Sequence, residues 1–284
     1  MGRALTGGAL DTSVTNVSNQ LGTFTRPNLL DNWYFGRPVN QRGVEEFAGY
    51  SYGLDRWWAN SSITGGITYR DNRLVIANQA GLIQKMDDYT PLNGKIVTIS
   101  LLTTDNELFW STDLFVDKDH DLTFDSGDII QFYYSTDFSG WQFYVKQSRN
   151  ILAAKLELGP TQTLAHREGD RWVLNEVPDY GEQLRRCQRY FYRVNSHAYG
   201  WTYNNNTVNC LIPLPVTLRT SPVITLNESG TINTVKGDAS MTSYEVKNTK
   251  PNGLIIDLHN SANALTTGTP VVWHNFDIDI SADL

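Results

Sequence analysis

The sequence predicts an all-β protein in which two sandwich domains are joined by one short helix. Most of the 284 residues form short apolar or aromatic runs separated by glycine, asparagine, aspartate and serine, the pattern typical of strands and tight turns. The content of 40% hydrophobic and 12% aromatic residues is sufficient for packed cores. One segment with helical periodicity interrupts this pattern and divides the chain.

The N-terminal segment, residues 1–25, has a pattern that two structures explain. Leu10, Val14, Val17 and Leu21 alternate in steps of four and three, which is the apolar seam of a coiled coil. Two heptads are too few to form a stable helix alone, and a flexible leader with accidental spacing accounts for the same residues. A coiled coil here would be the stump of an oligomeric shaft.

Residues 26–165 are predicted to form the first β domain, a jelly roll. Its clearest strands are 95–103, 129–135, 141–146 and 151–158. Turn-rich pieces such as 125–128 and 137–140 separate them, and this spacing suits a sandwich.

Residues 166–193 are predicted to be a linker that contains a helix. Asp179 and Glu182 have the spacing of a capping box, and Leu184, Cys187 and Phe191 follow at helical intervals. These residues predict a short helix over 181–192.

Residues 194–284 are predicted to form a second β-sandwich domain. Its expected strands are 208–216, 222–226, 244–247, 254–258 and 271–280. In the last of these, Phe276, Ile278 and Ile280 alternate with Asp277 and Asp279, which gives one buried and one solvated face.

Charge and hydropathy exclude two classes of partner. The formal net charge is -7 and no Lys/Arg run is sustained, so we expect no nucleic-acid binding. No stretch approaches the roughly 18 to 20 apolar residues of a membrane span, so we expect no membrane insertion. No signal peptide is recognised, and we expect a protein that acts outside a cell to have left its producer by lysis, as virions do.

The remaining chemical motifs give no support for catalysis or for a cofactor. The two cysteines, Cys187 and Cys210, have neither zinc-finger spacing nor the density of a disulfide scaffold, and buried free thiols are the simpler interpretation. A glycosidase needs two carboxylates with separated pKa values, and no setting among the 30 acidic residues singles out such a pair. We therefore expect a protein that is not an enzyme, with glycan depolymerisation as a less favoured alternative.

An acidic segment, residues 117–128, resembles a calcium loop in spacing only. Carboxylates occupy loop positions one, three, five, nine and twelve. Position six is Leu122 where the sharp turn needs glycine, and Asp128 is shorter than the glutamate that closes such a site. We favour a solvated acidic turn without a metal, and a structural calcium is the testable alternative.

The aromatic residues are the most suggestive feature, because sugar rings stack on Trp and Tyr while amides bond the hydroxyls. Candidates are Trp57, Trp58, Trp110, Trp141 and the segment 197–206. Trp33 and Trp57 are expected to pack in the core. The predicted ligand-binding residues, in what should be a loop, are Trp201, Tyr203, Asn204, Asn205 and Asn206.

Several segments resemble one family. Residues 28–35 (NLLDNWYF), 40–43 (NQRG) and 52–57 (YGLDRW) resemble the start of a jelly-roll domain, similar to carbohydrate-binding modules, found in tail proteins of phages and prophages. Residues 154–159 (AKLELG) and 162–166 (QTLAH) resemble its last strand and exit. Residues 180–191 resemble the helix before a small β tip domain, and 212–215 (IPLP) with 220–225 (TSPVIT) resemble the first strands of that tip.

The resemblance implies a place on a tail fibre or baseplate, a homotrimer, and other tail or baseplate proteins as partners. The protein would then be a virion tail component, extracellular when it acts, that attaches to a bacterial surface glycan. A structural spacer that extends the fibre without binding a ligand is the alternative. The segment after Asn227 shows no resemblance, so the specificity of the tip is not implied by the family.

Overall fold

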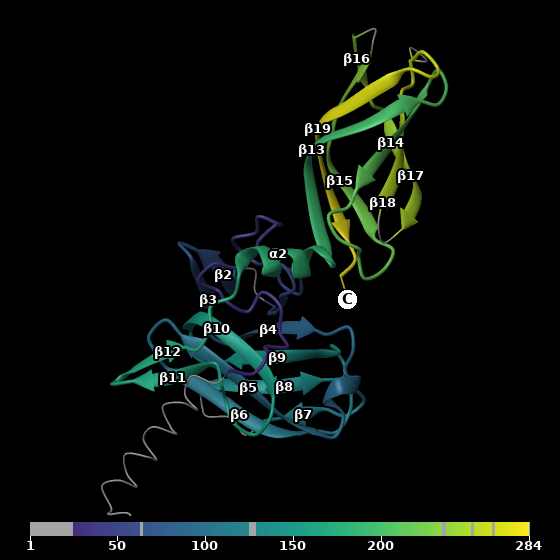
Figure 1. Cartoon of the computed structure of the whole chain (residues 1–284). Coiled ribbons are helices and arrows are strands. Elements are labelled where there is room, and N and C mark those ends of the chain that lie inside the picture. Colours follow the sequence, from purple (N-terminus) through teal and green to yellow (C-terminus); the bar gives the residue numbers. More distant parts are fainter. Residues whose placement is uncertain are drawn as a thin grey trace, which may run out of the picture. The chain divides into compact units, whose positions relative to one another are not determined.

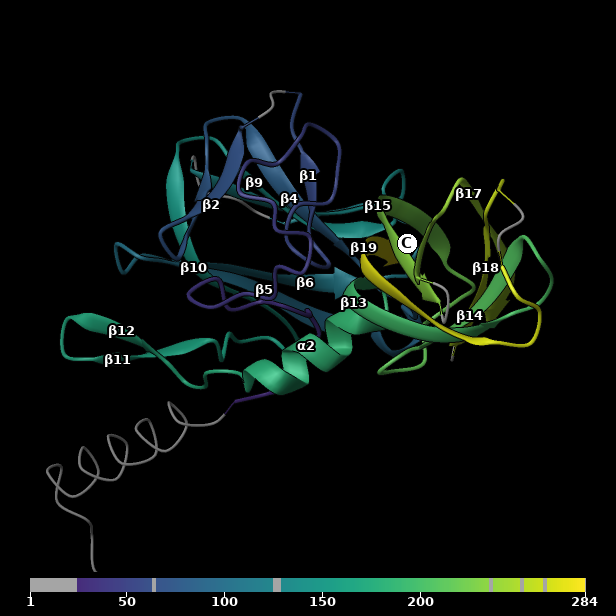
Figure 2. The same ribbon diagram turned by 90° about the horizontal axis from the view of Figure 1, so that it is seen from above.

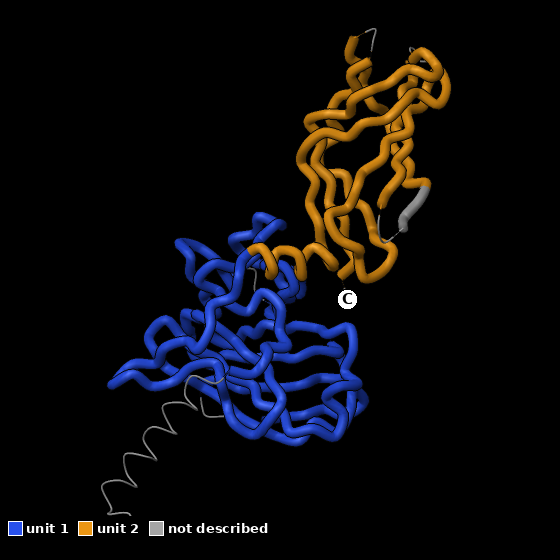
Figure 3. The backbone as a smooth tube through the Cα atoms, viewed as in Figure 1, with its two compact units in different colours: residues 1–180 blue, residues 181–284 orange. Residues whose placement is uncertain are grey.

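The computed structural model describes residues 25–62, 65–124, 129–234, 237–250, 253–262 and 265–283. The chain divides into two compact units, residues 1–180 and 181–284, here called the N-terminal and C-terminal units (Figures 1 and 3). The predicted heptad seam of residues 10–21 lies outside the described residues.

The N-terminal unit is a sandwich of two five-stranded sheets in which all neighbouring strands are antiparallel (Figure 1). In spatial order the first sheet contains β1 (Trp58–Asn60), β4 (Ala80–Lys85), β9 (Gly140–Val145), β8 (Ile130–Ser135) and β7 (Leu122–Thr123). The second contains β2 (Ile67–Arg70), β3 (Arg73–Ile76), β10 (Arg149–Leu158), β5 (Lys95–Thr103) and β6 (Leu108–Phe115). A short 3₁₀ helix, η1 (Thr90–Leu92), precedes β5.

Alternation along the strands explains why the two sheets face each other. In β8, Ile130, Phe132 and Tyr134 are buried, whereas Gln131 and Tyr133 between them are half-exposed. This period of two places every second side chain in the core between the sheets. Both sheets contribute to that single core.

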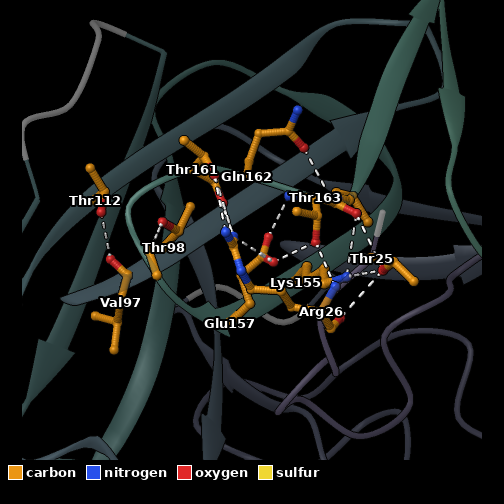
Figure 4. Close-up of polar contacts among 12 residues, drawn as sticks. Thr25, Arg26, Val97, Thr98, Thr112, Lys155, Glu157, Thr161, Gln162 and Thr163 are labelled. Carbon is orange, nitrogen blue, oxygen red and sulfur yellow. Dashed lines mark hydrogen bonds and ion pairs between the residues drawn. The ribbon is translucent and has the colours of Figure 1, made fainter. Parts of the chain in front are cut away.

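A cluster of buried polar side chains, here called the buried charge cluster, ties the start of the unit to β10 (Figure 4). The side chains of Lys155 and Glu157 are fully buried. The Lys155 ammonium donates to Thr25 Oγ1 at 2.6 Å, and Glu157 Oε1 accepts from the Thr163 N–H at 2.6 Å. Arg26 lies 3.6 Å from Glu157. The segment at Thr25 is therefore fixed beside residues that follow it by more than 130 positions.

A hairpin of β11 (Ala165–Glu168) and β12 (Arg171–Leu174) lies within the range predicted to be a linker. The Asn106 side chain binds both the N–H and the carbonyl of Trp172, at 2.7 and 2.8 Å. The hairpin thus packs on the N-terminal unit.

The helix α2 (Tyr180–Gln188) lies where the sequence predicts one, but it ends earlier than residue 192. The reason is that Phe191 and Tyr192 begin a strand, where they pair with Ser281 and Ile280. Glu182 and Arg185 form an i, i+3 ion pair on the exposed side of the helix. Among the described residues, no helix is long and apolar enough to cross a membrane.

The C-terminal unit is one seven-stranded antiparallel sheet that curves around a single core (Figures 1 and 2). In spatial order its strands are β16 (Gly237–Ser240), β15 (Val223–Thr234), β19 (Pro270–Ser281), β13 (Phe191–Thr202), β14 (Thr207–Pro213), β18 (Gly253–His259) and β17 (Ser243–Lys250). Bulges interrupt the pairing of β13 with β19 at Ser196/His197 and of β15 with β19 at Leu226/Glu228. Such bulges bend long strands, and the bending lets one sheet enclose its core.

The predicted all-β class is confirmed: the N-terminal unit packs two sheets as a sandwich, the C-terminal unit curves one sheet around its core, and the described residues contain one α-helix. The expected core positions Trp33 and Trp57 are buried, and the Trp57 indole donates to the Asn32 carbonyl at 2.8 Å. Cys187 and Cys210 are both buried, and no disulfide joins them. Burial raises the pKa of the Cys210 thiol to about 12, so it is unreactive at neutral pH.

Candidate functional site

Three aromatic side chains project from one strand of the C-terminal unit. Tyr199 and Trp201 lie on β13, and Tyr203 follows directly after its end. Their exposed fractions are 71%, 55% and 70%, whereas Ala198 before them and Thr202 between Trp201 and Tyr203 are buried. Alternate residues of a strand share a face about 6.7 Å apart along the chain, so Tyr199 and Trp201 lie on one face of β13, and Tyr203 is exposed just beyond its end. We call Tyr199, Trp201 and Tyr203 the aromatic ladder.

The prediction that residues 201–206 lie in a loop is wrong for Trp201 and Thr202, which belong to β13. The alternation of Tyr199, Trp201 and Tyr203 with small residues has the period of a strand. Gly200 is required by this pairing, because a Cβ there would lie 2.2 Å from the Asn209 carbonyl oxygen. Gly200 therefore allows the close approach of two strands and does not mark a turn. The turn comprises only residues 203–206.

The ladder lies between apolar neighbours on both adjacent strands. Tyr199 pairs with Val272 on β19 and with Leu211 on β14, and Leu211 is 51% exposed. A pocket of about 280 Å³ opens beside Tyr199. Its lining comes from three strands: Tyr199, Gly200, Asn233, Thr234, Pro270, Val271 and Val272.

Polar groups lie on the other side of Trp201. Asn209, its partner on β14, donates from Nδ2 to Asp257 Oδ1 at 2.8 Å, which leaves the Asn209 amide oxygen for another partner. Lys247 lies 3.9 Å from Asp257 and donates to Glu245 at 2.6 Å. That bond lowers the pKa of Glu245 and raises the pKa of Lys247, so both are charged at neutral pH. The exposed indole thus has the Asn209 amide on the neighbouring strand, and the charged groups follow on the next two strands of the sheet.

The three predicted asparagines have different roles. The Asn204 side-chain oxygen accepts from the Asn206 N–H at 2.9 Å, and the Asn206 oxygen accepts from the Thr207 hydroxyl at 2.9 Å. These two oxygens shape the turn. Asn205 is exposed, and its carbonyl holds Leu265 N–H at 3.0 Å. Of the predicted five residues, the structure therefore presents Trp201, Tyr203 and the Asn205 side chain to solvent.

The other aromatic candidates do not form a comparable row. Trp141 is buried in the core. Trp58 is half-buried between Tyr50 and Phe138, with ring centroids 5.8 and 5.6 Å away. Trp110 is 47% exposed on the edge strand β6.

The acidic segment begins as a turn in which the carboxylates of Asp117 and Asp121 accept hydrogen bonds from nearby groups. Asp117 accepts from the Asp119 N–H at 2.8 Å and lies 2.7 Å from His120 Nδ1, while Asp121 accepts from the Thr136 N–H at 2.7 Å. Residues 125–128 lie outside the described residues. Within the described ranges, no group of three His, Cys, Asp or Glu side chains is arranged to hold a metal ion.

One motif was missed in the sequence: residues 49–53 read Gly-Tyr-Ser-Tyr-Gly and match the Gly-x-Ser-x-Gly pattern of hydrolases. The pattern needs a strand, a sharp turn and a helix to expose the serine. Ser51 instead lies in a bend before β1, and its hydroxyl donates to the Ala48 carbonyl at 2.8 Å. The structural context of a nucleophile is therefore lacking at Ser51.

Comparisons do not add an identity to this geometry. No protein-family model, curated protein or solved structure matches the chain. The chemistry of the ladder is therefore inferred from its own residues. Three flat rings with neighbouring amide groups can bind a ligand that is apolar on one face and rich in hydroxyls at its edge.

Proposed function

We propose that this protein is the receptor-binding part of a phage-type tail fibre and attaches to a bacterial surface glycan through the aromatic ladder. The observation that carries the proposal is the exposure of Tyr199 and Trp201 on one face of β13, with Tyr203 exposed directly after the end of that strand. In this proposal the protein is a homotrimer that acts outside the cell on the virion tail, beside other tail or baseplate proteins.

A physical argument connects the ladder to sugars. Large apolar side chains in one exposed patch mark an interaction surface, and a sugar ring offers C–H groups that cover them. The hydroxyl groups at the sugar's edge would meet Asn209 and Asn205, whose side chains have hydrogen-bonding capacity left. The site would bind without catalysing a reaction.

The expected affinity explains why a trimer suits this function. A millimolar dissociation constant corresponds to about 4 kcal/mol, which is too weak for stable attachment by one site. Three linked sites raise the effective affinity by about 10² to 10⁴ when they engage one surface together. Light scattering should give the mass of three chains, and a monomer at micromolar concentration would contradict this part of the proposal.

The decisive experiment removes two rings of the ladder. The double variant Trp201→Ala/Tyr203→Ala should lose binding to an array of bacterial surface glycans while its melting temperature stays unchanged, because both side chains are exposed. Trp110→Ala is the matched control, since Trp110 is a similarly exposed tryptophan in the other unit. Unchanged glycan binding by a folded double variant would favour the structural spacer, and release of reducing sugar ends from wall material would indicate a depolymerase.

A further inference from the structure

A second pocket lies in the N-terminal unit, on the solvent side of the sheet that contains β8 and β9. Its volume is about 320 Å³, and its lining includes Tyr133, Tyr144, Gln142, Asn60 and Asp121. Gln142 and Tyr144 alternate with the buried residues Trp141, Phe143 and Val145 of β9, so they point away from the core. This volume is at the small end of ligand sites, which span about 300 to 1,000 Å³, and suits one or two rings.

Gln142 has a feature that ordinary surface residues lack. Its residue is only 6% exposed, yet its side-chain amide makes no hydrogen bond to any described residue. The amide nitrogen lies over Gly81, where a Cβ would be 2.7 Å from it and 3.3 Å from the Tyr144 ring. The amide atoms are not among the fully buried, unsatisfied polar atoms of the described residues, so they are reached from the pocket, where a hydrogen-bonding group of a ligand can pair with them.

The rest of the lining shows which chemistry fits. Tyr133 and Tyr144 lie on neighbouring strands in diagonal positions, Tyr133 opposite Gln142 and Tyr144 opposite Gln131. Their half-exposed rings supply flat apolar surface. Asn60, also without a side-chain hydrogen bond to any described residue, adds a second amide. A purely apolar ligand would leave both amides unsatisfied, whereas a hydroxyl-rich ring would satisfy them.

Charge at the pocket selects among such ligands. Asp121 is the only ionisable carboxylate in the lining, and neither lysine nor arginine lines the pocket among the described residues. The hydrogen bond from the Thr136 N–H lowers the pKa of Asp121, which is therefore ionised at neutral pH. A carboxylate or phosphate on the ligand would meet this negative charge without a cation to balance it.

From these contacts we infer that the pocket is a second saccharide-binding site, selective for neutral and amino sugars over acidic ones. This site is independent of the aromatic ladder, because it lies in the other compact unit and shares no residue with it. It also goes beyond the proposed function, which needs only one glycan-binding surface.

The test uses the full chain carrying Trp201→Ala/Tyr203→Ala, so that the ladder does not contribute. This protein is applied to an array of neutral, amino-sugar and uronate oligosaccharides, and the strongest neutral or amino-sugar probe is then titrated by calorimetry. Adding Gln142→Leu or Tyr144→Ala should weaken that binding at least tenfold. Gln147→Leu is the matched control, since Gln147 is exposed outside the pocket, and it should leave the affinity unchanged.

Selectivity gives an independent readout. Asp121→Asn should raise binding of the uronate probe relative to the neutral one, because it removes the charge at the rim. If Gln142→Leu lowers the melting temperature, Asn60→Ala replaces it, since Asn60 is half-exposed and lines the same pocket. The inference is overturned if the ladder variant binds no neutral or amino sugar, if the pocket variants bind as well as their parent, or if uronates bind best.

Discussion

The two units place their charged side chains differently. In the N-terminal unit, Lys155 and Glu157 are fully buried and bonded to Thr25 and Thr163. In the C-terminal unit, the ion pair of Arg193 with Asp279 has a distance of 2.7 Å, but the two side chains keep 30% and 23% of their surface exposed.

This difference indicates two ways of fixing a β fold. A buried ion pair adds little net stability compared with apolar packing, but it is costly to break, so it specifies which segments must meet. Apolar packing with surface ion pairs is more tolerant, because each exposed pair contributes only about 0 to 1 kcal/mol. The predictions below test whether the N-terminal unit depends on polar contacts and the C-terminal unit on packing.

The largest effect is expected from Glu157→Ala. This change removes the buried carboxylate that pairs with Arg26 and acts on the charge of Lys155, which keeps only the partly exposed Glu176 at 3.4 Å. We expect the free energy of unfolding of the N-terminal unit to fall by about 3 to 5 kcal/mol. Burial already lowers the pKa of Lys155, so the lysine tends to lose its proton when its partner is removed. Denaturant unfolding measures the change, with Glu45→Ala in its exposed pair with Arg70 as control. Equal losses for the two variants would show that the buried carboxylate contributes no more to the stability of this unit than an exposed one.

The next effect is expected from Ile256→Ala on β18. Its side chain is fully buried in the C-terminal core, and truncation should cost about 2 to 5 kcal/mol. Leu211→Ala on the neighbouring strand is the control, since Leu211 is 51% exposed and should cost less than about 1 kcal/mol. Calorimetry should show a lower melting temperature for the C-terminal unit and an unchanged melting temperature for the N-terminal unit. A uniform shift of all unfolding would mean that the two units do not unfold separately.

A smaller effect is expected from Tyr199→Ala, which tests the ladder without touching a core. We expect about tenfold weaker glycan binding, equal to about 1.4 kcal/mol, and an unchanged melting temperature because the ring is 71% exposed. Affinity on a glycan array and thermal unfolding are the two measurements. A large loss of stability would show that the ring packs rather than binds.

The smallest effect concerns His120, an exposed residue near the pocket of the N-terminal unit. Its contact with Asp117 raises the pKa of His120 above its usual value of about 6.5. A raised pKa in the folded state stabilises the fold below pH 6.5, and this contribution is lost as the pH rises through the raised value. An NMR titration of the imidazole should give a midpoint above 6.5 that falls in Asp117→Asn. An identical midpoint in both proteins would exclude this contact.

Most of the fold could be predicted because period-two alternation survives in the sequence. The predicted strand 95–103 coincides with β5. The strand β15 was underestimated as 222–226, because its polar residues 227–231 include Gly230, which has positive φ and suggests a turn. Backbone pairing between β15 and β19 nevertheless continues through this segment, so the strand extends to Thr234.

The candidate sites were predicted in part. Trp201 and Tyr203 were found from their composition, but Tyr199 was missed as a site residue because the segment was interpreted as a loop rather than as an alternating strand. The pocket of the N-terminal unit could not be predicted. Gln142 lies between the aromatic residues Trp141 and Phe143, and only the tertiary structure shows that its side chain lines a pocket and makes no hydrogen bond to a described residue.

The buried charge cluster also determines how the N-terminal unit would carry mechanical load. The segment at Thr25 and Arg26, where the described chain begins, is bonded directly to Thr161, Thr163 and Lys155, close to where the chain leaves the sandwich. Tension applied between these two points would pass through this short bridge and not through the strand pairs of the two sheets. The sandwich, and the pocket on its surface, would therefore keep their geometry under a pull that the bridge alone resists.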